Sequence, residues 1–302
     1  MGSPSPSSPL RYPGGKQCLA PFVGALIEGN GLHACSYAEP YAGGAGLALR
    51  LLLDGVVEGV LLNDKCPLVS MFWQVLFQQT EALLQCVADT PVSMEVWRHT
   101  REVTQRFRDF EPVDVAFALF FQNRTNFSGV IAGGVIGGKF QTGKYKLDAR
   151  YPKRRLLALM EKVAALRDRV EVFNMDALDF MRSHVLPLGN KCFTYCDPPY
   201  FVKGQGLYLN AYQPQDHQQV ASFLLGCPPE VRWMVSYDNV PEIVGMYKAA
   251  RLFSFDLPYS AHVKRQGKEL LALEPGVVLP KAARELVPLV AVGDDCDSAC
   301  AR

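Results

Sequence analysis

One short stretch, KCFTYCDPPY, constrains the fold of this chain more than any other. Residues 191–195 are typical of a buried strand, and Cys196, Asp197 and two prolines follow directly. Proline has no N–H for a neighbouring strand and holds φ at about −65°, so the strand must stop with its last carbonyls unpaired. Ligands of α/β sheets bind at the carboxyl ends of strands. An acid, free carbonyls and the ring of Tyr200 at such an end therefore predict a binding site.

Alternating strand and helix patterns extend on both sides of this stretch. QCLAPFVGALIEG has apolar residues at helical spacing up to Gly29, and VEGVLLND predicts a strand before a helix from about Pro67. HACSYAEPYAGGAGLALRLLLDG predicts a strand, a glycine turn and a helix, and together with the strand of VEGVLLND it makes a βαβ unit. The alternation stops from about residue 80 and then returns. The pattern predicts one doubly wound α/β domain, residues 10–79 and 156–279, interrupted by an insertion at 80–155.

The insertion carries an uneven charge. The whole chain has 31 basic and 30 acidic residues, a net charge of +1. Between residues 123 and 155, Asp148 is the one acid against eight basic residues: Arg124, Lys139, Lys144, Lys146, Arg150, Lys153, Arg154 and Arg155. A basic block inside a neutral chain indicates a polyanionic partner. A solvated loop is the alternative.

Composition also limits the class of protein. Nine cysteines without CxxC pairs favour reduced thiols in a cytoplasmic protein. The CxxxC pairs Cys192/Cys196 and Cys296/Cys300 lack the full ligand set that zinc needs, so we expect no metal. No apolar run approaches the roughly 20 residues of a membrane helix, so we expect no membrane partner. Residues 1–9, MGSPSPSSP, predict a disordered leader, and residues 280–302 form a tail without an assigned role.

A glycine-rich turn and a distant acid indicate the ligand. EPYAGGAG lies between a predicted strand and helix, where glycines allow a sharp turn and close approach of a ligand. Asp64 ends the next predicted strand, the position of a carboxylate that accepts from ribose hydroxyls. Together they indicate an adenosine-containing ligand. GKFQTGKY matches GxxxxGK, but Tyr145 stands where a P-loop needs Ser or Thr, so we exclude ATP hydrolysis.

In chain order, RYPGGK, AEPYAGGAGLAL, LLND and CDPPY resemble the Dam-like (D12 class, alpha group) DNA adenine-N6 methyltransferases over roughly residues 10–273. The resemblance implies a Rossmann-like, S-adenosylmethionine-dependent methyltransferase sheet. It also implies that residues 80–155 form a helical and hairpin target-recognition domain for double-stranded DNA. Tyr41 stands where the family usually has Phe, and Lys65 where a small apolar residue is common. Neither departure alters the expected chemistry.

The resemblance assigns roles to individual residues. The catalytic tetrad is Asp197, Pro198, Pro199 and Tyr200. The residues expected to bind the cofactor are Tyr12, Lys16, Glu39, Tyr41, Gly43, Gly44, Asp64, Asp176, Ala177 and Asp197. Asp176 matches the position expected to contact the adenine of the cofactor, with Ala177 and Leu178 alongside. The DNA-reading hairpin falls on NRTNFSGV. The residues expected to contact DNA are Asn123, Arg124, Asn126, Lys139, Lys144 and Lys146, with Arg124 reading a guanine and the lysines meeting phosphates.

The tetrad suits chemistry at an exocyclic amine. The N6 lone pair of adenine is delocalised, so the amine is a poor nucleophile until acceptors such as Asp197 and the Pro198 carbonyl take its hydrogens. Tyr200 offers a face on which a flipped base can stack, and we expect Phe201 in the same pocket. A cytosine-C5 mechanism needs a nucleophilic cysteine, usually in Pro-Cys, and the chain has no such dipeptide.

Two other functions stay open. One is adenine-N6 methylation of ribosomal RNA, and the other is DNA binding by a degenerate relative without activity. The basic insertion favours DNA, and the presence of Lys16, Asp64 and Asp197 favours an active enzyme. We expect a cytoplasmic monomer, prokaryotic or phage-encoded. A cognate restriction enzyme is a partner that the resemblance leaves open.

Overall fold

The computed structural model describes residues 6–12, 14–202, 212–256, 268–279 and 290–291. The chain forms two compact parts. The first part comprises residues 1–18, 42–54 and 60–175, and the second comprises residues 19–41, 55–59 and 176–302. Within the described ranges, every helix is too short or too polar to cross a membrane.

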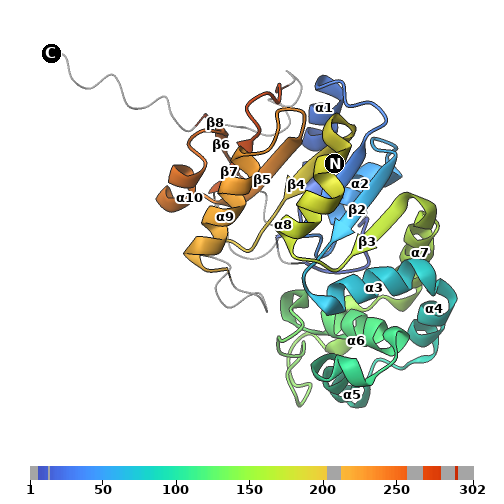
Figure 1. Cartoon of the computed structure of the whole chain (residues 1–302). Coiled ribbons are helices and arrows are strands. Elements are labelled where there is room, and N and C mark those ends of the chain that lie inside the picture. The colour runs from blue at the N-terminus through green and yellow to red at the C-terminus, as the bar shows by residue number, and fades with distance from the viewer. Residues whose placement is uncertain (1–5, 13, 203–211, 257–267, 280–289, 292–302) are drawn as a thin grey trace. The chain divides into compact units, whose positions relative to one another are not determined.

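The first part combines two parallel strands with a group of helices (Figure 1). β2 (Gly59–Asn63) pairs in parallel with β3 (Val170–Phe173), with Asn63 opposite Phe173. α2 (Gly46–Leu53) precedes this pair in the chain. Parallel neighbours need a long crossover, and the crossover here contains α3 (Pro67–Gln78), α4 (Thr80–Asp89), α5 (Met94–Gln105), α6 (Pro112–Thr125) and α7 (Lys153–Ala164). The insertion predicted at 80–155 therefore lies within one crossover connection.

α6 is the central helix of this group, and α3, α4 and α5 pack against it (Figure 1). Residues 115–123 of α6 are all buried, as expected for a helix that is apolar on every side. Phe120 stacks on Phe72 of α3 at 6.1 Å and meets the Tyr151 ring at 5.5 Å. This packing fixes the carboxyl end of α6, from which the basic stretch continues.

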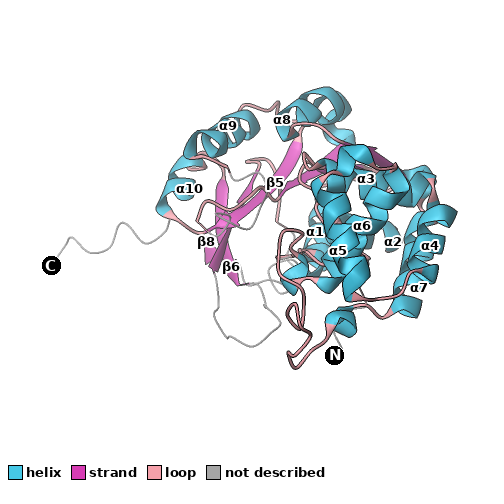
Figure 2. Cartoon of the chain, turned by 90° about the horizontal axis from the view of Figure 1, so that it is seen from below, coloured by secondary structure: helices cyan, strands magenta, loops and turns pink. Residues whose placement is uncertain are grey.

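The second part is a sheet with the strand order β1-β4-β5-β7-β6-β8. β1 pairs with β4 and β4 with β5 in parallel, whereas the remaining neighbours are antiparallel. The strands are β1 (Ser36–Glu39), β4 (Cys192–Cys196), β5 (Arg232–Asp238), β6 (Arg251–Asp256), β7 (Lys268–Leu273) and β8 (Val290–Ala291). The helices are α1 (Ala20–Gly29), α8 (Ala177–Phe180), α9 (Pro214–Leu225) and α10 (Pro241–Met246). α9 connects β4 to β5, and Figure 2 shows α9 and α10 next to each other beside these strands.

The structure confirms the predicted α/β class, because parallel strands are joined through helices in both parts. α1 ends at Gly29, as its spacing predicted, and α3 begins at Pro67, where the fixed φ of proline suits a first helical position. All five residues of β4 are buried, which explains their apolar sequence.

Three predicted segments differ from expectation or lie outside the described residues. Ser7 and Ser8, assigned to the leader, are buried, and the Ser7 hydroxyl donates to the Gly46 carbonyl at 2.6 Å. The hairpin expected at NRTNFSGV is the end of α6, a 3-10 turn at Phe127–Gly129, and one antiparallel bridge between Asn126 and Val135. Residues 1–5 lie outside the described residues, as do residues 280–289 and 292–302 of the predicted tail, with Cys296 and Cys300.

Candidate functional site

The glycine turn of the first part packs against Tyr12. Gly43 has φ +45°, and a Cβ placed on it would lie 2.7 Å from the Tyr12 ring. A Cβ on Gly44 would lie 3.0 Å from the Tyr12 side chain. The indole N–H of Trp73, buried on α3, donates to the Gly43 carbonyl at 2.9 Å. The structure thus brings three predicted cofactor residues together, and the contact with Tyr12 explains why two of them are glycine.

Asp64 joins this turn through its carboxylate. One oxygen accepts from the Gly43 N–H at 2.8 Å, and the other accepts from the Cys66 N–H at 2.9 Å. Burial raises the pKa of Asp64 to about 6, although the two N–H donors act in the opposite direction. Each oxygen has a lone pair beyond these bonds. The arrangement can accept hydrogen bonds from the hydroxyls of a ligand.

Asn63 orients the ends of the two strands beside Asp64. Its buried side-chain amide accepts from the Met175 N–H at 3.0 Å and donates to the Met175 carbonyl at 3.2 Å. The side-chain amide of Asn174 donates to the Asp64 carbonyl at 2.8 Å. Asn63 is not among the predicted site residues, and its position next to Asp64 was the one available signal.

Lys16, the last residue of the predicted lead motif, is also in the first part. Its side chain is buried, and the ammonium group donates to the Gly14 carbonyl at 3.0 Å. A buried ammonium is costly unless acceptors surround it. The turn that precedes Lys16 therefore supplies part of its solvation.

In the second part, Asp197 follows β4 and is bonded to the neighbouring strand. The Ser236 hydroxyl on β5 donates to Asp197 Oδ1 at 2.6 Å. Ser236 has one proton, so the Tyr195 hydroxyl must donate to Ser236 across their 2.6 Å contact. This relay from Tyr195 through Ser236 fixes one carboxylate oxygen of Asp197.

Two buried acids hold Tyr200, the last residue of the predicted tetrad, and the two residues that follow it. The ring of Tyr200 is half-buried, and its hydroxyl donates to Glu269 Oε2 on β7 at 2.7 Å. This hydrogen bond holds the tip of the ring. Asp238, at the end of β5, accepts from the N–H groups of Phe201 and Val202 at 2.9 and 2.8 Å. Sequence reasoning missed Ser236, Asp238 and Glu269. The polar run SYDN at the end of a predicted strand could have indicated the first two.

The other predicted cofactor residues of the second part have defined local roles. The carboxylate of Glu39, buried at the end of β1, accepts from the Tyr37 hydroxyl at 3.2 Å. The hydroxyls of Tyr41 and Tyr212 lie 3.0 Å apart. Asp176 caps α8, with Oδ1 accepting from the Leu178 N–H at 3.0 Å. The next residue, Ala177, is the buried first residue of α8.

Two residues predicted to contact DNA face inward. The side-chain amide of Asn123 accepts from the Arg11 N–H and donates to the carbonyls of Arg11 and Gly129, at 2.7, 2.7 and 2.9 Å. Asn126 accepts from the Trp97 indole at 2.7 Å and donates to the carbonyls of two loop residues. Both side chains are almost fully buried. They hold the end of α6 to the residues around it, because an amide offers both donors and acceptors to a buried backbone.

The predicted lysines, by contrast, are exposed. Lys144 lies over the Tyr145 ring at 5.7 Å, and Lys146 donates to the Gln141 carbonyl at 2.6 Å. Phe127, Phe140 and Tyr145 belong to the same stretch and are 58%, 91% and 59% exposed. Interleaved cations and exposed rings are typical of nucleic-acid-binding surfaces.

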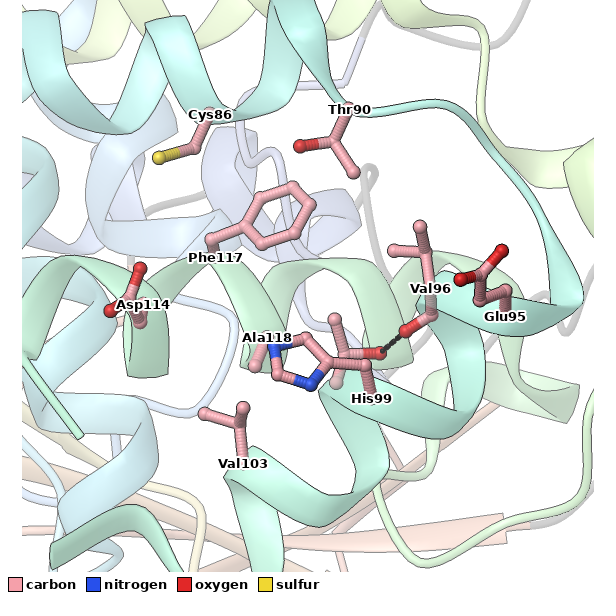
Figure 3. A pocket seen from close by; sticks show the side chains of 10 residues that line it. Cys86, Thr90, Glu95, Val96, His99, Val103, Asp114, Phe117 and Ala118 are labelled. Atoms are coloured by element: carbon pink, nitrogen blue, oxygen red, sulfur yellow. Dashed lines mark hydrogen bonds between the residues drawn. The ribbon is translucent and has the colours of Figure 1, made fainter. Parts of the chain in front are cut away.

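A cavity of about 320 Å³ lies among α4, α5 and α6 of the first part (Figure 3). Apolar side chains such as Val103 and Phe117 lie beside the polar groups of Cys86, His99 and Asp114 (Figure 3). None of the residues that line it was predicted as a site residue. Across the described residues, the structure has no group of three or more His, Cys, Asp or Glu side chains that could hold a metal ion.

Comparison with known proteins gives three findings. The family described as D12 class N6 adenine-specific DNA methyltransferase matches residues 12–261. No curated protein matches the chain. Among solved structures, the chain is similar to the rRNA methyltransferase aviRa from Streptomyces viridochromogenes, with 14% identity, 88% of each chain covered and a TM-score of 0.36.

Proposed function

Because the chain belongs to the D12 class family of N6 adenine-specific DNA methyltransferases, which are enzymes, we propose that it transfers a methyl group from S-adenosylmethionine to N6 of a flipped adenine in duplex DNA. The observation that carries the proposal is the Asp197 carboxylate. It follows a fully buried strand, two prolines follow it, and a hydroxyl on the next strand orients it. Such an acceptor suits a reaction in which an amine must lose its planarity.

S-adenosylmethionine fits the residues of the glycine turn. Asp64 accepts from the ribose hydroxyls, since its oxygens are already aligned by two backbone N–H groups. Gly43 and Gly44 keep the turn free of side chains beside Tyr12. Glu39, Tyr41, Asp176, Ala177 and Lys16 complete the proposed set of cofactor residues. When bound, this cofactor supplies an electrophilic methyl group on a sulfonium.

Asp197 and the Pro198 carbonyl accept the two amino hydrogens of the target adenine. As they draw the hydrogens away, the nitrogen lone pair leaves conjugation with the ring and becomes available for in-line attack. The Ser236 hydroxyl holds Asp197 without moving at the moment of reaction, which is electrostatic preorganisation. Pro199 keeps the backbone rigid at this point.

Tyr200 provides the stacking face for the flipped base, and Phe201 lines the same pocket. The Glu269 carboxylate holds the Tyr200 hydroxyl, which restricts rotation of the ring. Asp238 accepts from the backbone N–H groups of Phe201 and Val202, the two residues after Tyr200. A base-binding pocket built from restrained rings loses little conformational entropy when the base enters.

Residues 80–155 form the target-recognition region, and residues 10–79 and 156–279 form the catalytic domain. Lys139, Lys144, Lys146 and Arg124 contact DNA, while Asn123 and Asn126 support the segment that carries them. The support for this assignment is the net basic charge of residues 123–155 and the exposed rings in the same stretch.

The proposal is tested by expressing the protein in cells that lack adenine methylation. Methylation-sensitive sequencing of their DNA, with Asp197→Ala as the control, should show N6-methyladenine in one sequence context and only for the active protein. Methylated ribosomal RNA with unmodified DNA would instead support the RNA alternative. Unmodified nucleic acid of both kinds, with retained DNA binding, would support the degenerate relative.

A further inference from the structure

Three arginines of the first part lie near one another at the end of α6. Arg124 is in the last turn of α6, Arg11 precedes the glycine turn, and Arg150 is exposed at the end of a 3-10 turn. Burial and then the charge of Arg11 lower the pKa of Arg124 to about 10. Burial and then Arg150 lower the pKa of Arg11. We call these residues and Tyr151 the arginine cluster.

The cluster has positive charge without a compensating acid. Within the described ranges, no carboxylate forms an ion pair with Arg11 or Arg124. Arg124 Nε and the Tyr151 hydroxyl are both buried and have no hydrogen-bond partner. Arg11 and Arg124 are half-buried, and cations that are partly removed from water are normally paired, because desolvating an uncompensated charge is costly. The carboxyl end of α6 offsets only part of this cost. The protein alone therefore leaves donors in the cluster unsatisfied.

The same groups are held firmly in place. Asn123 bonds both the N–H and the carbonyl of Arg11, and the Arg11 guanidinium donates to the Asn126 carbonyl at 3.2 Å. The Tyr151 ring is fixed between Phe120 and Phe121, each at 5.5 Å. Such restraint is expected of a preorganised binding site.

We propose that the arginine cluster binds a backbone phosphate of DNA through the guanidinium groups of Arg11 and Arg124 and the hydroxyl of Tyr151. This inference rests on the proposed function for the identity of the partner. A guanidinium presents planar donors that match phosphate oxygens, and a phenol adds a donor of different direction. The inference assigns Arg124 to the sugar-phosphate backbone, although the sequence suggested guanine reading, because part of its donor set is buried next to Tyr151. Arg11, the first residue of RYPGGK, becomes a DNA-contacting residue, a role that the resemblance did not assign to it.

The first experiment compares Arg124→Met, Arg11→Met and Tyr151→Phe with Arg98→Met, which removes an exposed arginine of α5. Fluorescence anisotropy measures binding to cognate and scrambled duplexes across a salt series. We expect Arg124→Met to weaken binding to both duplexes alike, by about tenfold or more, and to lower the salt slope by about one. Tyr151→Phe keeps the ring and should weaken both by about threefold. Arg98→Met should leave both unchanged.

A loss confined to the cognate duplex would overturn the assignment in favour of base reading. Losses no larger than that of Arg98→Met would overturn it as well. If Arg124→Met fails to fold, the Tyr151→Phe comparison decides alone, since its packing is unchanged.

A second experiment separates the cluster from the enzyme activity. Inorganic phosphate at fixed ionic strength should raise the melting temperature of the wild type and leave that of Arg124→Met unchanged. In the absence of phosphate, Arg124→Met should be at least as stable as the wild type, because it removes a half-buried cation that has no acidic partner. Equal phosphate effects on both proteins would overturn the anion site. If phosphate raised the melting temperature but the protein did not bind duplex DNA, DNA would be overturned as the occupant of the site. If phosphate raised the melting temperature and the protein bound duplex DNA without methylating adenine, only the proposed function would be overturned.

Discussion

The side-chain amide of Asn123 bonds the backbone of Arg11 twice, accepting from its N–H and donating to its carbonyl at 2.7 Å each. The two residues are 112 positions apart in the sequence. The amide pairs with this backbone as a neighbouring strand would, so the residues before the glycine turn are joined to the end of α6. Arg11 and Arg124 are placed together as a consequence.

Asn123→Ala should lower the free energy of unfolding by about 2 to 4 kcal/mol, because it leaves three backbone groups in partly or fully buried positions without partners. Urea denaturation followed by circular dichroism measures this change. Asn190→Ala, at an exposed position, should change stability by less than about 0.5 kcal/mol. If the two substitutions had equal effects on stability, Asn123 would not be a structural clamp.

Gly129 lies against the Arg11 backbone, and Gly138, which has a similar backbone conformation but open space around it, serves as its matched control. Both have positive φ, +78° and +76°, but a Cβ on Gly129 would lie 2.4 Å from the Arg11 carbonyl, whereas nothing lies within 4 Å of one on Gly138. Gly138→Ala should cost about 1 to 2 kcal/mol for the left-handed conformation alone. Gly129→Ala should cost clearly more, because the backbone of Arg11 must move. Melting temperatures that fell equally would show that the clash is relieved without cost.

Asp197→Ala should reduce the single-turnover rate of methyl transfer by more than about a hundredfold, the usual cost of losing one preorganised group. Ser236→Ala should reduce it by about tenfold, since it removes a hydrogen bond to a charged group. Cofactor affinity should stay unchanged in Ser236→Ala, and Ser236→Thr should recover most of the rate. An Asp197→Ala rate within tenfold of wild type would exclude Asp197 from the chemistry.

Cofactor affinity should depend on pH through Asp64, whose pKa burial raises to about 6 from 3.8. A carboxyl with a raised folded pKa binds protons more readily in the folded state, so its ionisation reduces stability as pH rises from about 4 through about 6. In the proposed site, the ionised carboxylate accepts hydrogen bonds from ribose hydroxyls more strongly than the protonated acid does. Affinity for S-adenosylmethionine, measured by calorimetry, should therefore fall as pH drops below about 6. Asp64→Asn should bind weakly with no such dependence, and an equal pH dependence would mean that another group titrates.

Local sequence patterns were enough to predict several helices and strands and to locate the motifs. The apolar spacing before Gly29 indicated α1, and the proline at residue 67 marked the start of α3. The glycine turn and Asp64 could be paired from sequence because one follows and the other ends a strand. The leader was predicted too long, since a run of Ser and Pro does not reveal that Ser7 donates to Gly46.

The sequence by itself determined which residues carry reactive groups and which stretches are strands or helices, because these depend on neighbours a few positions away. The tertiary structure alone decided which groups meet. Cys196 lies opposite Val235 in the β4–β5 register, so Asp197 comes next to Ser236, 39 residues later in the chain. The same holds for Tyr200 with Glu269, and for Asn123, whose polar side chain turned inward to bond Arg11. A hydrogen bond requires two atoms within about 3 Å, and only strand pairing and helix packing bring such distant residues that close.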